Sequence, residues 1–544
     1  MDNTDSIDFV VQLANRRLTA EAKFVLIHVL RQFDYGVVDE RVKGLAGQMG
    51  MTDKVFKKAR DLLIELGYLF SVQRGHDGRL GVGRPKKAFQ ITAKTIEEFN
   101  DFCINNPIPS RIKLSHQTRI NKLLFEIYGA SHLQEPTANN DGKKIPKRQS
   151  GNLTPANRLL LAILYRHANE CGAVRGLGLS KLQGLAGLTA ARLETQLGKL
   201  SEMGYLLARV SGVTGRHLIG RSTGAFFLNV FNDDLGNDED SAVLVLMQTE
   251  AKDHFNEEFW GLRIFRESRS KRQELLKHDY LSKLESSIKN KCLSTEDIEE
   301  KLTEIRSMFL KQDVFEAISV QSNVQDSGLI YYIIDQVALE WRLKFECFNL
   351  QNYFQDEPLL TFAKFLQYKI NEYASIILSQ FWENLGINPI NIQEDILDKI
   401  SDEIYPENLR KKSDDEKHAR LIAEAIGLYI YRASFEVALQ AKWHVQNALK
   451  TNTEIKLNQL PYTLLPVQYE SNFANKLSIA VKLTNVHSKE RFIAIHVTSM
   501  SRNITATRTP YDAGASTERD ALLKSFGYGV KTKESKMRHS PPRK

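Results

Sequence analysis

The sequence is poor in cysteine and has no long apolar segment. Its four cysteines, Cys103, Cys171, Cys292 and Cys347, lie far apart, so it contains neither a CxxC zinc pattern nor a disulfide framework. The longest apolar runs, such as residues 242–247, are far shorter than the ~20 residues that a membrane-spanning helix needs. The acidic N-terminus lacks the basic and apolar regions of a signal peptide. We therefore expect reduced cysteines and a cytoplasmic location.

The motifs of common enzyme classes are also missing. The sequence contains no phosphate-binding loop, no His-x-His pair, no His-Glu-x-x-His and no Gly-x-Ser-x-Gly. Glu454-Ile-Lys456 has the spacing of a nuclease strand but no convincing partner aspartate, and His496-Val-Thr498 is half of a two-histidine phosphoesterase pattern. We expect no metal and no cofactor, and the sequence does not point to an enzyme.

Positive charge is concentrated in the N-terminal part. The 544-residue chain carries a net charge of +8, and counting along the sequence gives +13 for residues 1–232 and −5 for residues 233–544. The chain is also too long for one hydrophobic core, since single cores stop growing near ~250–300 residues. This asymmetry favours a polyanion-binding N-terminal part and a C-terminal part with another role.

An internal duplication organises the basic part. Each segment begins with Leu-Thr, at Leu18-Thr19 and Leu153-Thr154, where the threonine suits the N-cap of an apolar helix. Gly-Leu-Ala-Gly follows, at residues 44–47 and 184–187, and predicts a tight turn into a second helix. The two segments therefore share helix, turn and helix in the same order.

The second half of each segment repeats as closely. Thr52 and Thr189 are expected N-caps, and each lies fifteen residues before the Gly-Tyr-Leu that ends the helix. Two strand-like stretches follow and flank a loop that shares Gly-Arg-x-x-x-Ala-Phe, at residues 83–89 and 220–226. The pattern predicts a β-hairpin with a basic tip in each segment.

Helix, helix-turn-helix and β-hairpin in this order resemble the winged-helix family. Two copies in one chain resemble the tandem arrangement of some bacterial regulators and of replication initiators of plasmids and mobile elements. The resemblance covers about 40% of the chain and implies binding of double-stranded DNA, with the second helix of the turn in the major groove and the hairpin wing at the backbone or minor groove. It also implies a nucleoid-associated location.

The expected DNA-binding residues are polar or basic positions on the second helices and wings. The second helix of the first segment has an apolar stripe, formed by Val55, Phe56, Ala59, Leu62, Leu63 and Leu66. The stripe leaves cations outside, and a solvated helix face is the alternative reading. The candidates are Thr52, Lys54, Lys57, Lys58, Arg60, Arg74, Arg79, Arg84, Lys86 and Lys87 in the first segment, and Thr189, Arg192, Gln196, Lys199, Arg216 and Arg221 in the second.

Two features qualify this prediction. Gly83-Arg84-Pro85 resembles the core of an AT-hook, but Val82 replaces its first arginine, so a preference for A·T-rich minor grooves is in doubt. The second segment carries fewer cations, and it either contacts DNA weakly or serves only to pack.

The expected fold class is predominantly helical α+β, with two winged-helix domains, a larger helical region and a small β element. The expected boundaries are 1–93 and 151–232 for the winged helices, 94–150 for a helical connector and flexible basic linker, 241–450 for a helical domain that self-associates or binds a partner, 451–525 for the β element, and 526–544 for a disordered basic tail. Helical periodicity is clearest in residues 329–354, 359–382 and 417–449.

Three functions fit these features. A noncatalytic DNA-binding regulator is the leading hypothesis. A replication initiator of a plasmid or integrated mobile element would use the same modules on repeated sites. A DNA-targeted effector would carry an unrecognised enzymatic domain in its C-terminal part.

Overall fold

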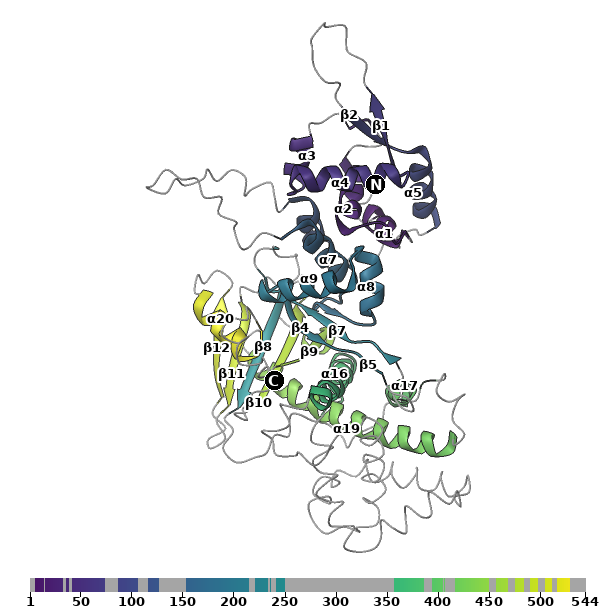
Figure 1. Cartoon of the computed structure of the whole chain (residues 1–544). Coiled ribbons are helices and arrows are strands. Elements are labelled where there is room, and N and C mark those ends of the chain that lie inside the picture. Colours follow the sequence, from purple (N-terminus) through teal and green to yellow (C-terminus); the bar gives the residue numbers. More distant parts are fainter. Residues whose placement is uncertain are drawn as a thin grey trace, which may run out of the picture. The chain divides into compact units, whose positions relative to one another are not determined.

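Helices dominate the described parts of the chain in the computed structural model (Figure 1). The structure describes residues 5–13, 15–32, 36–38, 42–73, 87–105, 116–126, 153–214, 221–232, 235, 241–249, 357–385, 394–404, 406, 416–449, 456–467, 475–483, 490–497, 504–510 and 516–528. Smaller sheets accompany the helices, so the predominantly helical α+β class is confirmed. None of the helices in these segments is long and apolar enough to cross a lipid bilayer.

The chain divides into two compact units. Unit 1 comprises residues 1–207, 228–239 and 529–544, and unit 2 comprises residues 208–227 and 240–528. The division falls within the second predicted hairpin, whose tip therefore belongs to unit 2.

The first copy of the duplication spans residues 5–105. Its elements are α1 (Asp5–Gln12), α2 (Ala20–Gln32), α3 (Val42–Gln48), α4 (Asp53–Glu65), β1 (Leu69–Gln73), β2 (Lys87–Ile91) and α5 (Ala93–Asn105). Strands β1 and β2 pair antiparallel, and Val38 adds a single bridge to Phe89. The ring of Phe9 on α1 lies 5.3 Å from Phe99 and 5.7 Å from Phe102 on α5. Helix α5 therefore packs as part of this copy, which corrects its assignment to a connector beginning at residue 94.

The second copy spans residues 116–232. Its elements are α6 (Gln117–Asn121), the π-helical turn η1 (Lys122–Glu126), α7 (Pro155–Arg166), β3 (Ala173–Val174), α8 (Leu179–Ala186), α9 (Ala190–Glu202), β4 (Leu206–Val210), β5 (Val213–Thr214), β6 (Arg221–Ser222) and β7 (Ala225–Leu228). Three of the strands form a sheet in the order β3-β7-β4. Ile120, Leu123 and Leu124 are buried, so α6 and η1 also belong to the copy that follows and not to a connector.

Both copies use the same local hydrogen bonds. Thr52 and Thr189 each cap a helix by accepting the amide of the residue three positions later, at 3.4 Å in both copies. Each helix then ends in a paired C-terminal turn around a glycine with positive φ, Gly67 (79°) and Gly204 (75°). In that turn the Tyr68 amide donates to Leu63 O and the Tyr205 amide to Leu200 O, both at 2.9 Å.

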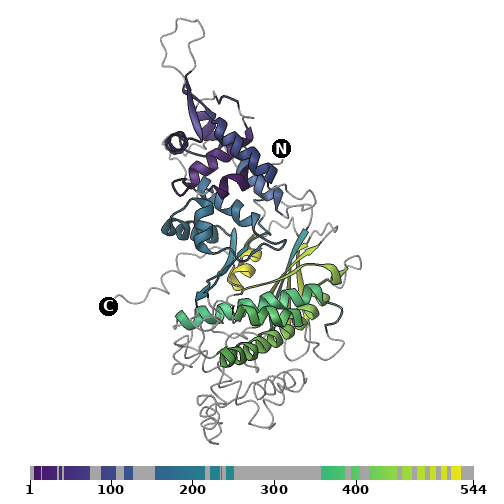
Figure 2. The ribbon, with the colours of Figure 1, turned by 90° about the vertical axis from the view of Figure 1, so that its right-hand side faces the viewer.

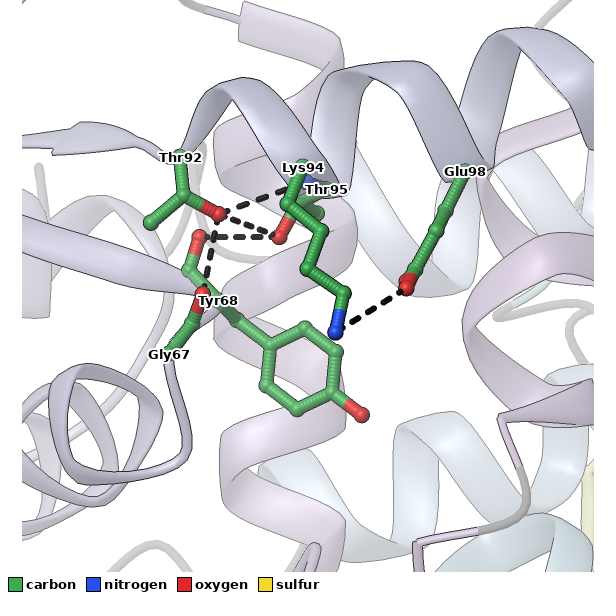
Figure 3. A network of polar contacts seen from close by, with 6 residues as sticks. All are labelled: Gly67, Tyr68, Thr92, Lys94, Thr95 and Glu98. Carbon is green, nitrogen blue, oxygen red and sulfur yellow. Dashed lines mark hydrogen bonds and ion pairs between the residues drawn. The ribbon is translucent and has the colours of Figure 1, made fainter.

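A side chain at the end of each hairpin repeats one further contact. Thr92 Oγ1 donates to the carbonyl of Gly67 at 2.9 Å, and Asn229 Nδ2 donates to the carbonyl of Gly204 at 2.8 Å. Figure 3 shows the first of these, together with Thr95, whose hydroxyl lies 3.3 Å from the Tyr68 carbonyl. Each copy thus ties the end of its hairpin to the end of its preceding helix in the same way.

Unit 2 is built around a five-stranded sheet. Its elements are β8 (Ser241–Thr249), α16 (Glu357–Gln380), α17 (Glu394–Ile404), α19 (Glu416–Leu449), the 3-10 turn η5 (Leu457–Gln459), β9 (Tyr462–Leu465), β10 (Asn475–Leu483), β11 (Glu490–Val497), β12 (Ile504–Pro510) and α20 (Ser516–Ser525). The strand order is β12-β11-β8-β10-β9, with β8 parallel to β11 and antiparallel to β10. Helices α16 and α19 lie along one face of the sheet (Figure 2).

This arrangement corrects three expectations for the C-terminal part. Residues 241–249 form the central strand β8, because the buried run Val243–Met247 fills a position between two other strands. The predicted β element is therefore part of the same unit as the helices. Phe526 and Tyr528 are buried, with Tyr528 Oη donating to Pro466 O at 2.8 Å, so a disordered tail cannot begin at residue 526. Residues 127–150 of the predicted connector and linker, the predicted helix at 329–354 and residues 529–544 of the predicted tail lie outside the described residues.

Candidate nucleic-acid interface

Helix α4 presents a group of exposed lysines opposite its buried face. Phe56, Ala59 and Leu63 are buried and fix the orientation of the helix. Lys54, Lys57 and Lys58, here called the lysine triad, are exposed on its N-terminal half. Thr52 caps this end, as predicted. The lysine triad therefore lies on the first two turns of a helix whose rotation is set by its core contacts.

Two residues of α4 differ from the sequence prediction. Val55 is 38% exposed and does not belong to the buried stripe. Arg60 is half-buried, and its guanidinium donates to the neighbouring Asp61 carboxylate at 2.6 and 3.0 Å. Because Arg60 is bound to this carboxylate, it contributes less positive charge to the surface than the lysines do.

Charge changes sign along α4. Asp61 and Glu65 are exposed on its C-terminal half, and Glu65 forms an ion pair with Arg17. Lys43, on the preceding helix α3, is exposed. The cationic surface thus belongs to the N-terminal end of α4.

The structure describes the β1–β2 hairpin of the first copy at its base. Gln73 and Lys87 are the last pair of the β1–β2 ladder, so residues 74–86 connect the two strands beyond that pair. Arg74, Arg79, Arg84 and Lys86 lie in this connection, outside the described residues. Their proposed contacts with DNA stay a prediction.

The second copy uses its corresponding helix differently. Arg192 NH1 lies 3.1 Å from Glu21 Oε2 of α2, and the two side chains form an ion pair. Gln196 is only 7% exposed, which corrects its expected outward orientation. Its position is equivalent to Ala59, which faces the core of the first copy. Thr189 and Lys199 are exposed as expected, Arg221 is exposed on β6, and Arg216 lies outside the described residues.

A position-by-position comparison of α4 and α9 makes the difference explicit. Counting from the capping threonines, Lys54 corresponds to Ala191, Lys57 to Glu194 and Lys58 to Thr195. All three positions of the second copy are exposed. The lysine triad therefore has no cationic counterpart on α9.

The two copies are held together by a buried lysine. Lys23 of α2 is 1% exposed, and its Nζ donates to Gly184 O and Leu185 O, at the C-terminal end of α8 in the second copy, at 3.1 and 3.0 Å. It also donates to Val11 O at the end of α1, at 3.2 Å. Burial lowers the pKa of Lys23 to about 8. The Lys23 amine, whether charged or neutral, interacts favourably with these three carbonyls, because the C-terminal ends of helices carry partial negative charge.

A buried arginine makes the reciprocal contact. Arg158 of α7 occupies the position equivalent to Lys23, four residues after the capping threonine, and is 0% exposed. Its NH1 donates to Met49 O, just beyond α3 in the first copy, at 2.9 Å. Its other nitrogens donate to Leu123 O and Leu124 O of η1, at 2.5 and 2.9 Å. In each copy, therefore, one basic side chain donates hydrogen bonds both to carbonyls of its own preceding helical turn and to carbonyls of the other copy.

A second pair of contacts follows the same exchange. Arg31 of α2 lies 3.5 Å above the ring of Phe125 on η1, and the equivalent Arg166 of α7 forms an ion pair with Asp8 on α1 at 2.6 Å. His28 also packs against Phe125, at 5.0 Å between ring centres. Burial, together with the charges of Arg158 and Arg31, lowers the pKa of His28 to about 3. The interface thus relates the two copies by an approximate twofold exchange.

Comparisons with known proteins add no relative to this picture. No protein-family model, curated protein or solved structure matches the chain. Within the described segments, no group of three or more histidine, cysteine, aspartate or glutamate side chains could hold a metal ion.

Proposed function

We propose that the chain is a noncatalytic regulator that binds duplex DNA, with its two copies as winged-helix modules and α4 as the helix that enters the major groove. The observation that carries this proposal is the exposed lysine triad on the N-terminal half of α4. In helix-turn-helix proteins this end of the second helix approaches the bases and phosphates. Lysine suits phosphate contacts better than bidentate base contacts, so positioning on the backbone supplies most of the affinity.

The remaining parts have supporting roles in this proposal. The basic connection at residues 74–86 would act as the wing of the first module and reach the adjacent backbone or minor groove. Unit 2, whose chain region carries a net negative charge, would mediate self-association or docking of a protein partner. The location is cytoplasmic and nucleoid-associated.

Binding of a labelled duplex over a range of salt concentrations tests the proposal. Neutralising three phosphates adds about −2.7 to the slope of log affinity against log salt, and a triple variant Lys54→Ala, Lys57→Ala, Lys58→Ala should lose this increment and at least tenfold in affinity. The matched control removes the same charge from exposed positions on α5, α8 and α17, as Lys94→Ala, Lys181→Ala, Lys399→Ala. Equal losses in both variants would contradict a specific role for α4.

Selection from a random duplex library then separates the three functions. A single enriched site fits the regulator, directly repeated sites beside an A·T-rich segment fit the replication initiator, and metal-dependent cleavage of the selected DNA fits the effector enzyme.

A further inference from the structure

We propose that unit 1 is an intramolecular dimer whose second DNA-contact surface, on α9, has been silenced, so that one chain reads a single half-site through α4. This inference rests on the proposed function of α4. It concerns the layout of the DNA element, which is asymmetric although the protein unit is nearly twofold.

The reciprocal contacts carry the first step. In a twofold interface, residue i contacts j and residue j contacts i. Lys23 and Arg158 occupy equivalent positions. Lys23 donates to Gly184 O and Leu185 O in the last turn of α8, and Arg158 donates to Met49 O just beyond the end of α3. Arg31 and Arg166 are also equivalent, and each contacts the helix that begins the other copy. The interface is therefore closed within one chain.

The second step follows from that symmetry. An operation that exchanges α2 with α7 and α3 with α8 also exchanges α4 with α9. The exposed face of α9 therefore occupies the position equivalent to the lysine triad. Dimeric helix-turn-helix proteins use two such helices to read two half-sites. Here the second position carries Ala191, Glu194 and Thr195, whose summed charge is −1 against +3 on α4.

The differences between the copies include the exposed positions that a DNA-contacting surface needs. The second copy keeps the threonine caps and the glycine turn, so its fold is retained. At the position of the exposed Val55 it has Arg192, which is paired with Glu21 in the interface. Its hairpin is also engaged, because the ring of Phe227 lies 6.1 Å from Tyr368 on α16 within unit 2. The second copy thus serves as the built-in partner of the first copy in this interface.

A graft of the lysines onto α9 tests the silencing. In the full chain, Ala191→Lys, Glu194→Lys and Thr195→Lys are introduced into the Lys54→Ala, Lys57→Ala, Lys58→Ala background. If α9 occupies an equivalent position, the graft should restore duplex affinity to within about threefold of wild type and recover about 2.7 in the salt slope. The control adds the same charge of +4 on α5, as Glu97→Lys and Asp101→Lys, both at exposed positions, and should not recover the slope.

The same graft in the wild-type background sharpens the result. It should either steepen the salt slope on one duplex or allow a second duplex to bind, and both outcomes support an equivalent second position. Restoration no greater than that of the α5 control overturns the inference while leaving the function of α4 intact. A wild-type chain that does not bind duplex DNA at low salt overturns both.

Discussion

The first and second copies of the duplication differ in their surfaces much more than in their scaffolds. They share capping threonines, glycine turns and the bond from the end of the hairpin to the end of the helix, at closely similar distances. They differ where α4 exposes three lysines and α9 exposes none at the equivalent positions. The residues that determine the fold and the residues that would recognise a partner are therefore at different positions, so the second group can change while the first is kept.

Removal of Arg158 should have the largest effect, because this residue binds carbonyls of both copies. In Arg158→Met the carbonyls of Met49, Leu123 and Leu124 lose their donor, and buried groups without a partner cost ~1–3 kcal/mol each, so we expect a loss of about 3 kcal/mol or more. Hydrogen exchange should accelerate in α2 and α7 together. Arg17→Met, at an exposed arginine, is the control and should leave both helices protected. Exchange confined to α7 would show that the copies do not depend on each other.

Lys23→Met tests the other half of the exchange. It removes one flexible amine from the carbonyls of Val11, Gly184 and Leu185, and we expect a loss of about 2 kcal/mol, smaller than for the rigid guanidinium. Protection in α8 should fall together with that in α2. Lys43→Met is the exposed control. An unchanged α8 would mean that Lys23 does not link the copies.

Acid should destabilise the first copy specifically, because α2 contains the buried His28 and the equivalent helix α7 contains no buried histidine. The pKa of His28 is lowered to about 3 in the fold, against 6.5 when unfolded, so the unfolded chain binds more protons between these values and stability falls as pH drops through this window. At pH 5 the loss is about 2 kcal/mol. His28→Ile introduces the residue that the second copy has at this position, Ile163, and should reduce the fall in melting temperature between pH 7 and pH 5. A melting temperature with the same pH dependence as wild type would contradict this assignment.

The smallest expected effect is one that the copies should share. Gly67→Ala and Gly204→Ala place a side chain at positive φ, where nothing lies within 4 Å of the new Cβ, so the cost is conformational and about 1 kcal/mol in each copy. Gly44→Ala and Gly184→Ala, in helices and also unobstructed, should instead stabilise by about 0.5–1 kcal/mol. Thermal unfolding of the four variants measures this. Unequal costs at Gly67 and Gly204 would show that the two turns are not equivalent.

Local chemistry made the helix ends predictable. Thr52, Thr189, Gly67 and Gly204 act within a few residues of themselves, and all four lie where the sequence pattern placed them. The prediction that Gln196 faces outward is wrong, because a polar residue suggests exposure whereas Gln196 is buried. Aligning α9 with α4 would have placed Gln196 on the buried Ala59 position, so the signal was present in the repeat.

Contacts between distant segments could not be predicted from the local sequence pattern. Lys23 and Arg158 are cations in apolar helices, and only their equivalent position after each capping threonine could have marked them as interface residues. The partners of β8 lie more than 200 residues further along the chain, so its apolar run predicts burial but not the strands beside it.

The central place of β8 has a consequence for synthesis of the chain. Its antiparallel neighbour is far away in sequence, since Thr249 pairs with Asn475. At ~5–20 residues per second, ribosomes need roughly 10 to 50 seconds to make the intervening segment. During that time the apolar run Val243–Met247 has been translated without its partner strands. Unit 1 can complete its interface early, whereas unit 2 depends on the last part of the chain and is the part of the nascent protein most exposed to aggregation and most dependent on chaperones.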